Sequence, residues 1–138
     1  MIEEKPPFEL AGWITIIGID RSGKRFILAD RKNQIQSNAK NILVHALAEG
    51  TFLVDQIKVY KAGAPLATTP PLTWSFPPGN DKVLFNGRFD EASFNDTFDE
   101  IRLDSSTGGN FSKITGLSVT KNNTLQLEVQ WKITLNNL

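Results

Sequence analysis

The chain has 138 residues, no cysteine, and fifteen basic and fifteen acidic side chains that cancel in net charge. Such a length predicts one domain with its own core, and the composition excludes disulfides, thiolate metal sites and the strongly basic face that a nucleic-acid partner normally needs. The acidic start is not a secretory signal and no stretch approaches the ~20 apolar residues of a membrane span, so we expect a soluble protein made in a cytoplasm.

The first residues are predicted to form an extended arm. Residues 1–9 are mostly polar, and Pro6 and Pro7 restrict the backbone to extended conformations. The single domain is then expected to span residues 10–138. Its first hairpin is predicted from two stretches rich in β-branched and aromatic residues, 12–19 and 25–29, joined by a turn at 20–24.

One helix is predicted near residues 37–49. Apolar residues recur there at spacings of three and four, which is the period of a helix with one buried face. Ser37 is a candidate for the cap at its start, and Gly50 is a candidate for its end.

Strand patterns resume after the helix. They cover residues 51–60, 81–90, 95–104 and 111–120. Between the first two lies the segment 64–80, whose five prolines exclude a central strand and favour a long surface loop.

The last strand has the most regular pattern. From Leu125 to Leu135 every odd position is apolar and every even position is polar, so one face is expected to be packed and the other polar. The predicted core side chains are Leu127, Val129, Trp131 and Ile133. With about seven or eight strands and one short helix, the chain is predicted to be mainly β, a single antiparallel, jelly-roll-like β-sandwich.

No pattern predicts a catalytic residue, a metal or a cofactor. His45 is the single histidine, and its place inside the predicted helix favours a structural or surface role. Six carboxylates gather late in the chain: Asp90, Glu91, Asp96, Asp99, Glu100 and Asp104. We expect them to face solvent or to form ion pairs between subunits, with a cation site as the alternative.

The segment 70–78 carries two proline pairs around Leu72, Trp74 and Phe76. These three bulky side chains alternate, so an extended backbone places them on one side. They either fold onto the domain's own core or insert into a neighbouring subunit. The second alternative, together with Pro7 and Phe8 from the arm, gives the predicted subunit interface.

Two blocks of the sequence resemble small structural proteins that bacteriophages and prophages encode. The first, NQIQSNAKNILVHALAEG (33–50), is similar to a helix start in those proteins. The second is a C-terminal block of the form E-x-x-L … K … L-x-V-x-W-x-I-T. Its members here are Glu100, Ile101, Leu103, Lys121, Leu125, Val129, Trp131, Ile133 and Thr134.

The resemblance implies a non-enzymatic virion protein, either a minor capsid component at a vertex or as decoration, or a tail or fibre adaptor. Its expected partners are further copies of itself, as a trimer or pentamer, and other virion proteins. The alternative function is a receptor- or carbohydrate-binding module of a phage tail, with Trp13, Tyr60 and Trp74 as a stacking platform. A small hydrolase is a third possibility that the lone histidine and scattered acids disfavour.

Overall fold

The computed structural model describes residues 8–69, 72–79 and 81–137, and only the backbone of Phe8 and Asn137. The described part is mainly β with one helix. Its elements are β1 (Phe8–Ile19), β2 (Arg25–Ile35), α1 (Ala39–Glu49), β3 (Val54–Lys61), β4 (Ala64–Thr68), β5 (Thr73–Ser75), β6 (Lys82–Phe89), β7 (Asp96–Phe98), β8 (Glu100–Ser105), β9 (Gly109–Ile114), β10 (Val119–Lys121) and β11 (Gln126–Asn137).

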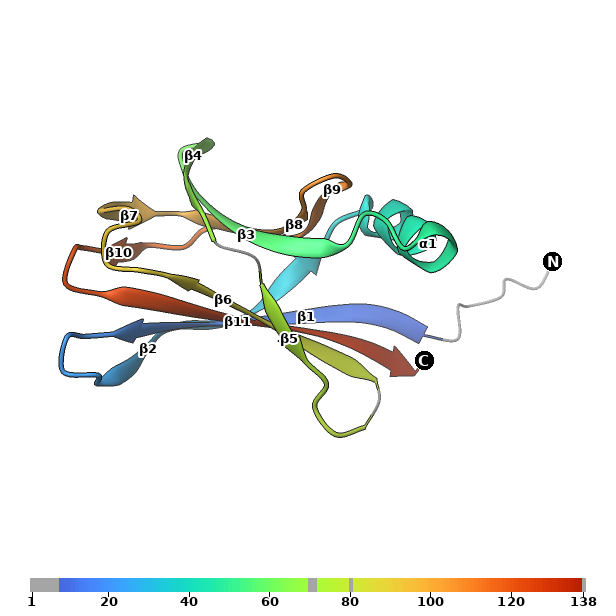
Figure 1. Cartoon of the computed structure of the whole chain (residues 1–138), viewed down its shortest axis with the longest axis horizontal. Coiled ribbons are helices and arrows are strands. Elements are labelled where there is room, and N and C mark those ends of the chain that lie inside the picture. The colour runs from blue at the N-terminus through green and yellow to red at the C-terminus, as the bar shows by residue number, and fades with distance from the viewer. Residues whose placement is uncertain (1–7, 70–71, 80, 138) are drawn as a thin grey trace.

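Nine of these strands form one antiparallel sheet, in the order β4-β3-β8-β9-β2-β1-β11-β6-β5, while β7 and β10 pair separately. The large sheet curls on itself, so that β3, β8 and β9 lie over β1, β11 and β6 (Figure 1). The prediction of a jelly-roll-like sandwich with two sheets is therefore wrong. The fold is a single curled half-barrel sheet with a small two-stranded sheet beside it.

The sheet is continuous because β2 joins its two halves, which are β4-β3-β8-β9 and β1-β11-β6-β5. Residues 25–33 of β2 pair with β1, and Gln34 and Ile35 pair with β9. The sequence pattern predicted a strand that ends at residue 29. In the structure Asp30, Arg31 and Lys32 continue the strand with their side chains exposed to solvent.

On the other side, the path from β4 to β5 ties the two halves together. The amide of Thr69 donates to the carbonyl of Ile57 (2.9 Å), and the Thr69 hydroxyl accepts from the Ile57 amide (3.0 Å). The amide of Leu72 donates to the carbonyl of Asp55 (3.3 Å). Because β5 then pairs with β6, this crossing joins the two ends of the sheet across the core.

β11 lies in the middle of one half, between β1 and β6. It pairs with β1 over its full length, from Gln126 opposite Ile19 to Asn137 opposite Phe8. Its apolar face is buried against the other half of the sheet. That face carries Leu127, Val129, Trp131 and Ile133, none of which exposes more than 6% of its surface.

The remaining elements follow the predictions with shifted bounds. The helix and its end at Gly50, which has a φ of 67°, are confirmed, but α1 begins at Ala39 after Asn38 rather than after Ser37. The proline-rich segment 64–80 contains β4 and β5, which stand at the two edges of the sheet, where a missing amide donor is tolerated.

The predicted strands 95–104 and 111–120 are each divided in two. β7 and β8 replace the first, and β9 and β10 replace the second. At the start of the chain, Phe8 and Glu9 are already part of β1. The predicted arm therefore extends no further than residue 7, and Pro7 lies outside the described residues.

Candidate functional site

The concave face of the half-barrel carries a row of large apolar residues that becomes exposed at one edge. Trp74 of β5 lies opposite Phe85 of β6, which lies opposite Trp131 of β11, which lies opposite Ile14 of β1. Ile14 and Trp131 are fully buried, whereas Trp74 is 64% exposed. The core therefore continues into an open apolar surface at β5.

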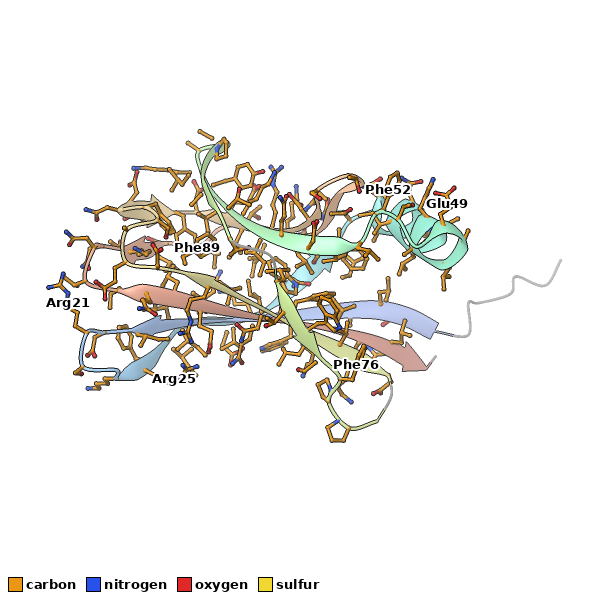
Figure 2. All side chains as sticks on the ribbon, in the orientation of Figure 1. Arg21, Arg25, Glu49, Phe52, Phe76 and Phe89 are labelled. Carbon is orange, nitrogen blue, oxygen red and sulfur yellow. The ribbon has the colours of Figure 1, made fainter. Side chains whose placement is uncertain are left out.

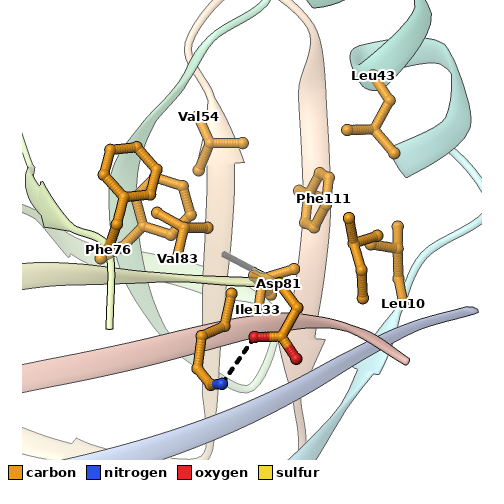
Figure 3. Close-up of a pocket in the computed structure, with 11 residues that line it drawn as sticks. Leu10, Leu43, Val54, Phe76, Asp81, Val83, Phe111 and Ile133 are labelled. Atoms are coloured by element: carbon orange, nitrogen blue, oxygen red, sulfur yellow. Dashed lines mark hydrogen bonds and ion pairs between the residues drawn. The ribbon is translucent and has the colours of Figure 1, made fainter. Parts of the chain in front are cut away.

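This surface contains a cleft of about 290 Å³ between α1, the start of β1 and the β5–β6 edge (Figure 3). Leu10, Leu43 and Val54 contribute to its walls from β1, α1 and β3. A second hollow of about 260 Å³ adjoins it and shares several of its lining residues. The lining that the two share consists of Leu43, Val54, Phe76, Val83, Phe85 and Phe111.

The charged groups at the cleft neutralise each other. The Lys82 ammonium donates to the Asp81 carboxylate (2.7 Å) and to the carbonyl of Pro78 (3.1 Å). The hydrogen bond from Lys82 lowers the pKa of Asp81 below its ordinary value. The cleft therefore offers apolar contact with a neutral ion pair at its rim, which suits an apolar group better than a charged substrate.

Phe52 forms part of the wall of the second hollow beside α1 and has a strained backbone. Its φ is 56°, a left-handed conformation that bulky residues rarely adopt. Its ring stacks on His45, with ring centroids 4.3 Å apart. The ring also occupies the space above Gly108, where an added Cβ would meet it at 2.8 Å. Because Phe52 lines the second hollow, His45 helps to hold the wall of that hollow.

Exposed apolar side chains concentrate at the same end of the molecule. Val44 and Leu47 on α1 are 60% and 88% exposed. Leu53, Trp74, Phe76 and Leu135 line the two hollows and are also exposed. Phe52 beside α1 and Phe76 beyond β5 mark this region, and Arg21 and Arg25 lie at the opposite end (Figure 2). Surfaces of this kind are typical of docking sites.

The structure separates the residues of the predicted subunit interface. Leu72 belongs to the buried core, whereas Trp74 and Phe76 are exposed beside the cleft. Pro7 and the side chain of Phe8 lie outside the described part. Leu10, Leu43 and Val83 also line the cleft. Sequence reasoning did not identify them as site residues, because only the curl of the sheet brings them together.

The six late carboxylates do not converge on one point. Asp96 pairs with Lys61 (2.8 Å), and Glu100 pairs with Arg102. Asp99 accepts from the Ala62 amide. Among residues 8–69, 72–79 and 81–137, no three potential ligands gather in a way that could hold a metal ion.

The three aromatic residues of the predicted stacking platform are also apart. Trp13 is next to the inward-facing Ile14 on β1 and therefore faces the convex side, whereas Trp74 lies on the concave side. Tyr60 on β3 is buried beneath the Arg102 guanidinium, 4.1 Å from its ring centroid.

Comparisons with known proteins identify no relative: no family model, no curated protein and no solved structure matches the chain. In the part of the chain that the structure describes, no helix is long and apolar enough to cross a membrane.

Proposed function

We propose that this protein is a non-enzymatic structural component of a bacteriophage particle, which assembles through the apolar surface around α1 and β5. One observation carries the proposal. Of the eight large apolar side chains that are strongly exposed among the described residues, six lie on α1 or line the adjoining hollows. Burial of that surface against another protein would contribute roughly 25 cal/mol for each Å² of apolar area, from which the entropy cost of association is subtracted.

The sequence resemblance supplies the biological setting. It points to a minor capsid component or a tail or fibre adaptor that binds copies of itself and other virion proteins. Contact by shape and apolar area suits a chain with no cysteine and no net charge. Aromatic anchors such as Trp74 commonly carry much of the binding energy of such contacts.

Assembly is tested by placing a charge on the proposed surface. Trp74→Asp and Phe76→Asp alter side chains that are 64% and 73% exposed, so the fold should tolerate them. Because an aspartate at an apolar interface loses its water without gaining a partner, each variant should lower the mass measured by light scattering from that of an oligomer toward that of a monomer.

The matched control is Ile27→Asp, which changes a side chain that is 65% exposed on β2, away from the cleft. It should keep the mass of the unaltered protein. Binding to purified phage particles is measured in parallel. An unaltered chain that is a stable monomer and that binds no particles would contradict the proposed function.

A further inference from the structure

We propose that the cleft receives residues 1–7 of a second copy of this chain, so that neighbouring subunits are joined by their N-terminal segments. This inference rests on the proposed function and names its binding partner and binding site. It is argued from the position at which β1 begins, from the chemistry of the segment and from the charge beside the cleft.

The segment joins the fold at the cleft itself. β1 begins at Phe8, and Leu10, two residues later, lines the cleft. β1 then runs from this end of the molecule toward the opposite end (Figure 1). The residues that precede Phe8 therefore connect to β1 at the end that carries α1.

The sequence disfavours a return of the segment into its own cleft. Pro6 and Pro7 directly precede Phe8. Proline fixes φ near −65° and restricts the residue before it to extended conformations, so a tight reversal there is costly. The cleft that receives the segment is thus expected to belong to another subunit.

The chemistry of the segment matches the surface that it would cover. Met1 and Ile2 precede the charged residues 3–5, and the proline pair follows them. Seven extended residues span about 23 Å at ~3.3 Å each, enough to follow a groove rather than fill a single pocket. Prolines also reduce the entropy that the segment loses on binding.

Next to the cleft, a groove between β1 and the start of α1 shares Leu10 and Leu43 with it. Lys40 and Glu9 line this groove, and neither forms an ion pair with any described residue. The Lys40 ammonium complements the carboxylates of Glu3 and Glu4, and the Glu9 carboxylate complements Lys5 of the same segment. The segment and the groove thus both combine apolar side chains with charges of both signs.

Such a contact is heterologous, because the segment of one subunit meets the cleft of the next. Heterologous contacts close into rings when the rotation between subunits permits. This geometry agrees with the trimer or pentamer that is expected for this chain.

The absence of cysteine permits a direct test with the full chain. Two single variants, Ile2→Cys and Phe76→Cys, are purified, mixed and oxidised. A disulfide between positions 2 and 76 can then form only between two different molecules. We expect a covalent dimer of the two variants on a denaturing gel, with the bond located by mass spectrometry.

The matched control replaces Phe76→Cys by Ile27→Cys, which has similar exposure but lies away from the cleft. The control mixture should give at least tenfold less of the mixed dimer, in which position 2 of one variant is bonded to position 27 of the other. Equal yields would overturn the inference. So would a double variant, Ile2→Cys with Phe76→Cys, in which the disulfide forms only within one chain.

Deletion of residues 1–7 separates this inference from the proposed function. The truncated chain should keep its melting temperature and lose its oligomeric mass. If it keeps that mass while Trp74→Asp loses it, the apolar surface has another occupant, so the inference fails and the proposed function stands. If all of these chains keep the mass of the unaltered protein, the proposed function fails as well.

Discussion

Lys121 and Glu128 are buried ionisable residues whose charges are satisfied by different groups. The Lys121 ammonium donates to the carbonyls of Glu91 (2.8 Å), Phe94 (2.9 Å) and Asn122 (3.2 Å). Burial lowers the pKa of Lys121, and the nearby charges of Asp90 and Glu91 oppose that shift. Lys121 therefore holds the loop between β6 and β7 close to the turn after β10, and it loses hydration by doing so. The sequence offers little sign of this role, because a lysine next to Asn122 is typical of an exposed turn.

Glu128 lies on the convex face of β11 between Arg25 and Arg88. Burial alone would raise the pKa of its carboxyl, but hydrogen bonds from the two guanidinium groups outweigh burial and hold the pKa below its ordinary value of 4.5. The folded state thus releases this proton more readily than the unfolded chain does. The stabilisation is complete above about pH 5 and is lost as the pH falls through the folded-state pKa.

We expect Glu128→Gln to lower the free energy of unfolding by about 1–2 kcal/mol at pH 7, because both arginine side chains remain about half exposed and solvent limits the loss. The difference from the unaltered protein should shrink as the pH is lowered toward 3. Urea denaturation at several pH values measures it. Arg21→Gln, which removes the exposed ion pair with Glu91 but keeps the Glu91 carboxylate near Lys121, is the control and should change stability by less than about 1 kcal/mol. A pH-independent loss for Glu128→Gln would contradict the argument.

Trp131 is the largest fully buried side chain among the described residues. Trp131→Ala should therefore cost about 3–5 kcal/mol, from lost apolar transfer and the remaining cavity. In a domain that is stable by ~5–15 kcal/mol, this loss should sharply lower the melting temperature and the soluble yield. Trp74→Ala removes an exposed indole and is the matched control. Equal melting temperatures for the two variants would show that the alternation of β11 had been misinterpreted.

Among the elements, the predictions succeeded where the alternation of apolar and polar residues is long and the strand has one buried face. β11 has one buried face along its length, so its alternation and its inward side chains were visible in the sequence. β5 was not predicted, because a strand of three residues between proline pairs is too short to show an alternating pattern. The start of α1 was misplaced because Asn38, and not Ser37, stands at the N-cap position; the Asn38 side chain donates to the carbonyl of Gly108 (2.8 Å) and does not cap the helix.

The crossing from β4 to β5 depends on Gly87 of β6. A Cβ at this position would lie 2.8 Å from Leu72, and 3.1 Å from both Ile57 and Thr69. Gly87→Ala should thus push the crossing away from the sheet and cost about 1–3 kcal/mol, as overpacking typically does. Chemical denaturation measures the change.

Leu72→Ala provides the test of this cause. If the contact with Leu72 is responsible, the double variant Gly87→Ala with Leu72→Ala should be more stable than the sum of the two single losses predicts. Strict additivity would show that the cost of Gly87→Ala has another origin.

At the scale of the whole molecule, the sequence predicted a mainly β domain with one helix but not its architecture. The difference between a sandwich and a half-barrel lies in β2, which continues through the charged residues 30–32, beyond the predicted end at residue 29. Pairing of Ile35 with Ser112 of β9 is what makes the sheet continuous. Such a partner cannot be identified from the local pattern, because it depends on which strands lie nearby after folding.

The candidate site was predictable only in part for the same reason. Trp74 and Phe76 drew attention as alternating bulky residues between prolines. Leu10, Leu43 and Val54 come from three separate elements, and each looks like an ordinary core residue in its own stretch. Their common cleft exists only because the curl of the sheet leaves one end of the core uncovered.

The pairing of β1 with β11 also sets the order of events during synthesis. β2 can pair with β1 as soon as the first hairpin leaves the ribosome, but the other neighbour of β1 consists of residues 126–137. Until that stretch emerges, the nascent chain carries a long apolar strand with one open edge, which is a hazard for misassociation. The half-barrel is thus completed only after nearly all of these residues have been translated.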